Sequence, residues 1–134
     1  MNLSTLPVRP PCPPGACICE REQLLDAPGA DLRILRLTRL EERRLLERLE
    51  SLQSLVDLAR LQQRMFEQLG LRVQVQPGAT EVRSMRGIRI EIEPLPGLCR
   101  KTRQAIPAAI RRALERHPAM AFELLNSHDL LRDA

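Results

Sequence analysis

The N-terminal segment carries three of the chain's four cysteines within eight residues, from Cys12 to Cys19. Prolines at positions 7, 10, 11, 13 and 14 and a glycine at position 15 surround them. Because proline has a fixed φ and no backbone N–H, no helix or strand can form here. The fourth cysteine, Cys99, follows a second stretch rich in proline and glycine, residues 94–98. We therefore predict that all four thiols lie in loops, where they can act as thiolate ligands of a metal.

The spacing of these cysteines suits one ion. Cys17 and Cys19 form a C-x-C pair that can place both sulfurs on the same metal, and Cys12 can fold back through a Pro-Pro-Gly turn. Tetrahedral zinc needs a fourth ligand. Cys99 can supply it if the N-terminal arm that carries the other three cysteines packs on the loop before Cys99. The predicted zinc ligands are Cys12, Cys17, Cys19 and Cys99.

Several alternatives stay open for the thiols. His117 or His128 can replace Cys99 as the fourth ligand. The arm's C-x4-C-x-C spacing is one residue shorter than the plant-type ferredoxin run, so an iron–sulfur cluster is the rival cofactor. The thiols can also be unliganded, either reduced or acting as a redox switch through a disulfide such as Cys12–Cys17.

Length and composition predict a globular protein. At 134 residues and 43% hydrophobic content, the chain is expected to fold as one domain with its own core. We divide it into an arm with a short helix, residues 1–30, and an α+β domain, residues 31–134. The sequence has neither a membrane-spanning apolar run nor a secretory signal. We therefore expect a cytoplasmic protein with no membrane association, in which metal or redox use of cysteine is commoner than a disulfide framework.

The first half of the chain predicts one strand between helices. Residues 20–25 predict a short helix, because acidic side chains in the first turn suit the helix dipole. Residues 32–37 predict a strand. Thr38 and Glu41 then fit a capping box, so that a helix begins at Thr38.

The helical stretch that follows has no glycine or proline until Gly70. Its apolar seam drifts around the helix axis, which fits either one helix of about 30 residues or two helices that break near residues 51–54. The seam is buried on the domain's own sheet, or else contacts a protein partner or a second copy in a homodimer through residues 39–69.

The second half predicts a small sheet and two helices. Residues 71–76 and 88–93 alternate strictly between apolar and polar, which is typical of half-buried antiparallel strands, and residues 81–85 are a candidate edge strand. Pro107 either opens the next helix or lies within a longer one that begins near Arg100. The predicted fold is an α+β fold in which about three antiparallel strands pack on a long helix or helical hairpin and two C-terminal helices.

Positive charge concentrates in the last third of the chain. The formal net charge is +4, and residues 100–134 hold seven basic and four acidic side chains. A second candidate function is therefore a nucleic-acid- or ribosome-associated protein that contacts phosphates through this region. The strands carry no aromatic residue for base stacking, and no nucleophile or acid–base motif is present, so we expect a non-enzymatic interaction or regulatory protein that binds zinc. The predicted phosphate-binding residues are Arg100, Lys101, Arg103, Arg111, Arg112 and Arg116.

Overall fold

The computed structural model describes residues 8–12, 17, 19–77 and 87–127. Its elements are α1 (Arg21–Asp26), the 3-10 helix η2 (Arg33–Arg36), α2 (Arg39–Glu50), α3 (Leu55–Leu69), β1 (Val73–Pro77), β2 (Ile88–Ile92), α4 (Arg100–Arg116) and α5 (Pro118–Ser127). This arrangement confirms the α+β class. The strands number two rather than three within the described residues.

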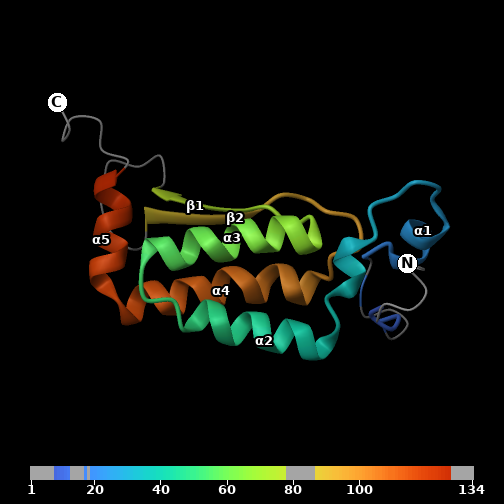
Figure 1. The fold of residues 1–134 in the computed structure, drawn as a ribbon, viewed down its shortest axis with the longest axis horizontal. Coiled ribbons are helices and arrows are strands. Elements are labelled where there is room, and N and C mark those ends of the chain that lie inside the picture. Colours follow the sequence, from blue (N-terminus) through green and yellow to red (C-terminus); the bar gives the residue numbers. More distant parts are fainter. Residues whose placement is uncertain (1–7, 13–16, 18, 78–86, 128–134) are drawn as a thin grey trace.

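Helix α4 lies at the centre of the molecule. Helices α2, α3 and α4 run along the long axis of the molecule (Figure 1). The two strands lie along one side of these helices, and α5 crosses one end. Helix α4 contacts α2, β2 and α5. Its inward side chains are fully buried because they lie on one broad helical stripe, as expected for a helix covered on several sides. They are Ile106, Ala109, Ile110, Ala113 and Leu114.

The two strands pair antiparallel, with Val73 opposite Ile92. Apolar side chains alternate with exposed polar ones, so one face of the sheet packs on helices and the other faces solvent, as the sequence predicts. Side chains from the helices also hold the strands. Gln62 of α3 donates to the carbonyl of Val73 at 2.8 Å, and Arg111 of α4 donates to the carbonyl of Ile88 at 2.9 Å.

The predicted strand at residues 32–37 is wrong, because this segment forms the 3-10 helix η2. Its apolar residues repeat every three positions, which matches the three residues per turn of a 3-10 helix better than strand alternation. Tertiary contacts also favour the helix. Arg33 donates from Nη1 to the carbonyls of Phe66 and Glu67, at 3.1 and 3.0 Å, and so caps the C-terminal end of α3. The candidate edge strand at residues 81–85 lies outside the described residues.

The long helical stretch is two helices, the second of the two alternatives. Thr38 caps α2 by accepting a hydrogen bond from the Glu41 amide at 3.4 Å, and Ser54 caps α3 by accepting one from the Asp57 amide at 3.1 Å. A serine that offers a new N-cap makes a break at residues 51–54 favourable. Helix α3 ends at Gly70, whose φ of +73° is the left-handed conformation typical of this position.

The C-terminal helices follow the second alternative for Pro107, which lies inside α4 rather than at its start. Helix α5 begins directly at Pro118, after His117 closes α4. No helix in the described part of the chain is long and apolar enough to cross a membrane.

Candidate metal centre

The four cysteine sulfurs converge at one point. The N-terminal arm that carries three of them lies with α1 at one end of the molecule (Figure 1). All four Sγ atoms lie within 4.8 Å of one another, and those of Cys12 and Cys99 are 3.4 Å apart. Zinc–sulfur bonds of about 2.3 Å in a tetrahedron place the sulfurs roughly 3.8 Å apart. The cluster is thus close to the size that one tetrahedral ion requires. A disulfide, with a bond of about 2.05 Å, is not formed by any of the four.

Cys99 is placed by a tight turn at the start of α4. It is the N-cap residue of α4, and Gly97 before it has a φ of +93°. A Cβ atom at Gly97 would lie 2.7 Å from Cδ2 of Leu24 and 2.8 Å from Cγ2 of Ile34. Glycine is required at position 97, because it adopts the left-handed conformation without strain and has no Cβ to clash with α1 and η2. This turn therefore fixes Cys99 against the segment that carries the other thiols.

Hydrogen bonds hold the cysteine-bearing part of the arm to α1, to η2 and to the turn before α4. The Gly97 amide donates to the carbonyl of Cys19 at 2.7 Å, and the Arg9 amide donates to the carbonyl of Leu35 at 2.7 Å. Nε of Arg21 donates to the carbonyl of Arg9 at 2.8 Å. The arm thus pairs with the turn before α4 and with η2, which brings its cysteines to Cys99.

Arg9 supplies positive charge beside the thiols. Its Nη2 donates to Sγ of Cys19 at 3.3 Å, and its buried Nε has no hydrogen-bond partner among the described residues. A buried guanidinium is stable where an anion lies beside it. Sequence reasoning missed Arg9, although it is the only charged residue in positions 1–19 and its isolation among apolar residues was a usable signal.

The environment shifts the acidity of the thiols in opposite directions. A hydrogen bond from the Arg100 amide, at the N-terminus of α4, lowers the pKa of Cys17 to about 7. Burial raises the pKa of Cys99 above its usual value. The hydrogen bond with Cys99 lowers the pKa of Cys12, but burial and the neighbouring charge of Cys19 outweigh it and leave that pKa raised. The helix N-terminus that stabilises the Cys17 thiolate is therefore that of α4.

The predicted phosphate-binding residues do not form one patch. Arg100, Lys101 and Arg103 are exposed on the first turn of α4, directly after Cys99. Arg116 is also exposed, but it lies about 24 Å away along the helix, because each residue of an α-helix advances about 1.5 Å.

The remaining two of these arginines make contacts within the molecule. Arg111 is half-buried and bonds to the carbonyl of Ile88, and Arg112 donates from Nε to Glu50 of α2 at 2.7 Å. Both side chains therefore hold α4 to its neighbours. Nucleic-acid binding through this helix stays a prediction.

His117 does not join the thiols. His117 closes the opposite end of α4, where its amide donates to the carbonyl of Ala113 at 3.0 Å. It is about 27 Å along the helix from Cys99. His128 lies outside the described residues.

No family model, curated protein or solved structure matches the chain. The geometry of the thiols and the charges around them are therefore the observations that bear on function.

Proposed function

We propose that this chain is a zinc-binding interaction or regulatory protein, in which Cys12, Cys17, Cys19 and Cys99 hold one Zn²⁺ ion. The observation that carries the proposal is the convergence of four thiols from two distant segments within 4.8 Å. Four thiolates arranged around a point favour zinc, or a single iron, over an iron–sulfur cluster, because a cluster's irons and sulfides hold the cysteine sulfurs further apart.

The charges around the site support an anionic centre. Four thiolates on Zn²⁺ leave two net negative charges. Helix α4 has no acidic residue in its first turn and carries Arg100, Lys101 and Arg103 there instead. Cations at a helix N-terminus are unfavourable, because they face the positive end of the helix dipole. A zinc–thiolate centre beside this turn offsets both the dipole and the cations, and Arg9 contributes to the same balance.

The ion's role in this proposal is structural or regulatory. A site with four protein thiolates is closed, and so leaves no coordination position for a substrate or an activated water. The metal links the arm to Cys99 at the start of α4, in addition to the hydrogen bonds already present. Metal availability would then control whether the arm is held against the body.

Elemental analysis tests the proposal directly. We expect about one zinc per chain by ICP-MS in untagged protein purified without oxygen or chelator. Replacement of zinc by cobalt is expected to give the intense absorption bands of a tetrahedral thiolate site. Cys17→Ser should lower metal occupancy and weaken those bands, whereas Arg43→Gln, an exposed change on α2, should change neither.

Two results would contradict the zinc assignment. Iron with an equal amount of acid-labile sulfide would replace it with a cluster. Metal-free protein with four reduced thiols, unable to take up zinc or cobalt, would remove the site altogether.

A thiol redox switch is the second candidate, and the 3.4 Å contact between Cys12 and Cys99 favours it. Hydrogen peroxide would accept two electrons and two protons from these thiols, giving one disulfide and two molecules of water. This step predicts a mass loss of about 2 Da in metal-free protein, reversed by a dithiol reductant. Peptide mapping that places no bond between Cys12 and Cys99 would exclude the step.

A further inference from the structure

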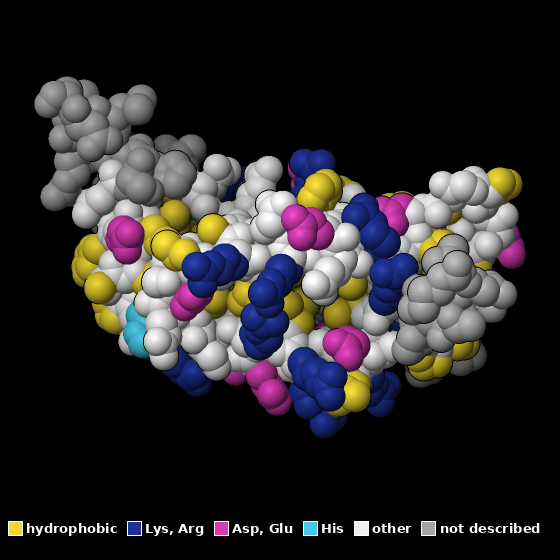
Figure 2. All heavy atoms as spheres, viewed as in Figure 1, with side chains coloured by type: hydrophobic (Ala, Val, Ile, Leu, Met, Phe, Trp, Pro, Cys, Tyr) yellow, Lys and Arg dark blue, Asp and Glu magenta, His cyan; other side chains and the backbone are white. Residues whose placement is uncertain are grey.

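A groove runs between α2 and α3 on the face seen in Figure 2. Its volume is about 640 Å³, and an adjoining hollow of about 290 Å³ shares Arg48, Leu61 and Arg64 with it. The floor is apolar and includes Leu37, which directly follows η2, Leu45 of α2 and Met65 of α3. Both helices contribute to the groove because each packs on other elements, α2 on α4 and α3 on η2 and β1.

Arginines line the rim of this apolar floor. They come from η2, α2 and α3: Arg36, Arg44, Arg48, Arg60 and Arg64. The lining holds only two acidic residues, Glu41 and Asp57. Glu41 pairs with Arg44 at 3.3 Å, and the Asp57 carboxylate accepts a hydrogen bond from the Gln53 amide at 3.4 Å.

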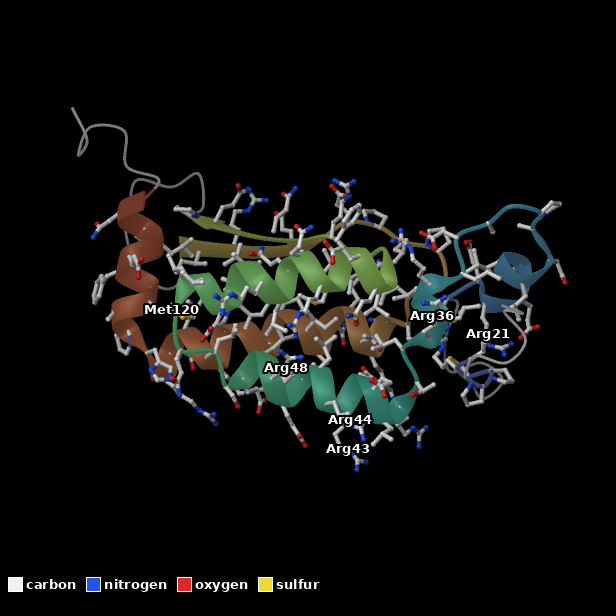
Figure 3. All side chains as sticks on the ribbon, in the orientation of Figure 1. Arg21, Arg36, Arg43, Arg44, Arg48 and Met120 are labelled. Carbon is white, nitrogen blue, oxygen red and sulfur yellow. The ribbon has the colours of Figure 1, made fainter. Side chains whose placement is uncertain are left out.

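The positive charge of the rim is largely uncompensated within the molecule. Among the described residues, no hydrogen bond or ion pair is made by the side chains of Arg48, Arg60 and Arg64. In Figure 3, Arg44 and Arg48 lie on α2 and Arg36 lies toward the arm. Arg43 lies next to Arg44 in this view but does not line the groove. Blue side chains gather over α2 and α3 in Figure 2, and yellow side chains are visible between them.

We propose that this groove binds an acidic amphipathic helix of a partner protein. The apolar face of such a helix would cover the leucines and methionine of the floor, and glutamates or aspartates on its flanks would meet the arginines. Two antiparallel helices offer a third helix a channel in which side chains at positions i, i+3, i+4 and i+7 become buried. Helices α2 and α3 span about 18–22 Å, which matches a ligand helix of roughly 12–15 residues. The proposal is independent of the metal centre.

The exposed residue Leu40 extends the apolar floor to the surface. Its side chain lines the groove and is 54% exposed, although leucine is usually buried. A ligand helix would cover it, and in doing so would remove from water an apolar side chain that the fold leaves uncovered.

The charge and apolar surface of the groove favour an acidic helix over two other occupants, a second copy of the chain and a nucleic acid. A second copy docked groove to groove would bring arginines against arginines, which is unfavourable. A nucleic-acid backbone would satisfy the arginines but leave the leucine floor uncovered, because phosphates and sugars offer little apolar surface. An acidic amphipathic helix satisfies both the charge and the apolar surface.

A peptide selection tests the proposal. The probe is a display library of helical peptides of about 15 residues, with leucine fixed at i, i+3, i+4 and i+7 and with Glu, Lys, Gln or Ser allowed on the flanks. Selection on the whole protein should enrich glutamate at the flanks. Arg48→Glu with Arg64→Glu should weaken the selected peptide at least about tenfold in fluorescence anisotropy, since each variant places like charges opposite each other. Arg39→Glu with Arg43→Glu, an equal charge change at exposed positions of α2 outside the groove lining, should have little effect.

A second pair of variants separates apolar docking from simple charge attraction. Leu40→Glu should weaken the same peptide about tenfold or more, whereas Val56→Glu, at an exposed position outside the groove lining, should not.

Four outcomes would overturn the proposal. The selection could enrich lysine or neutral residues at the flanks, or the groove and control variants could have equal effects. Duplex DNA or RNA at matched concentration could displace the peptide. Sedimentation equilibrium could show a homodimer that Leu40→Glu dissociates.

Discussion

The N-terminal arm and the body around α4 are held by different kinds of interaction. In the body, Ile106, Ile110 and Leu114 are fully buried among other apolar side chains. The arm's Cys12, Cys17 and Cys19 are only half-buried, and hydrogen bonds to η2 and to the turn before α4 attach this segment to the body. Apolar packing spreads its free energy over many contacts, whereas the arm depends on a few specific bonds and on the thiols. The arm should therefore be the part whose order responds to metal, and the body the part that persists without it.

Metal removal is the largest test of this difference. Structural zinc sites have apparent binding free energies of about 10–16 kcal/mol. After chelation we expect the amides of Arg9 and Gly97, which bond to Leu35 and Cys19, to exchange with solvent at least about a hundredfold faster. Amides inside α4 should keep their protection. Hydrogen exchange with mass spectrometry measures both, and a parallel loss in α4 would show that the arm and body unfold together.

Ile110→Ala tests the body. Its side chain is fully buried, and removing it leaves a cavity, so the free energy of unfolding in urea should fall by about 2–5 kcal/mol. Zinc content of the folded variant should stay unchanged. The matched control is Leu40→Ala, an exposed position that should cost less than about 0.5 kcal/mol. Loss of zinc from folded Ile110→Ala would contradict the independence of the two regions.

Gly97→Ala tests the junction between them. The added Cβ meets Leu24 and Ile34, and the positive φ is strained for alanine, so we expect a loss of about 1–3 kcal/mol together with lower metal occupancy. Gly29→Ala is the control, because Gly29 has a φ of +70° but nothing within 4 Å of its added Cβ. The difference between the variants in urea unfolding measures the close approach alone. Equal losses, with metal occupancy unaffected, would mean that the turn does not position Cys99.

Thiol alkylation is the finest test, because it changes a rate rather than the fold. With its pKa lowered to about 7, about half of Cys17 is thiolate at pH 7, against roughly one per cent for a thiol of pKa 9.0. Limiting iodoacetamide should therefore modify Cys17 first in metal-free protein, and Cys99 last because burial raises its pKa. Raising the pH toward 9 should speed the labelling of Cys17 only about twofold, because about half of this thiol is already ionised at pH 7. Peptide mass mapping reads the order, and fastest labelling of Cys99 would contradict it.

Local patterns in the sequence were enough for most of the regular elements. The alternation within residues 71–76 and 88–93 predicted both strands, because one face of each is buried and the other solvated. Thr38 and Gly70 marked helix ends, since capping is a local interaction. The strand predicted at residues 32–37 was wrong, because a short apolar segment can form either a strand or a helical turn. Its contact with α3 favours the 3-10 helix.

The groups available for the site are apparent from the sequence: four thiols in irregular segments, and basic residues after Cys99. The sequence did not determine that Cys99 lies beside Cys12, because that proximity depends on how the turn at Gly97 packs against α1 and η2. The sequence did not predict the groove either. Its arginines belong to three separate elements, which come together only in the folded structure. Residue types and local periodicities can be read from the sequence. The distances between segments far apart in the chain depend on packing, so only the folded structure gives them.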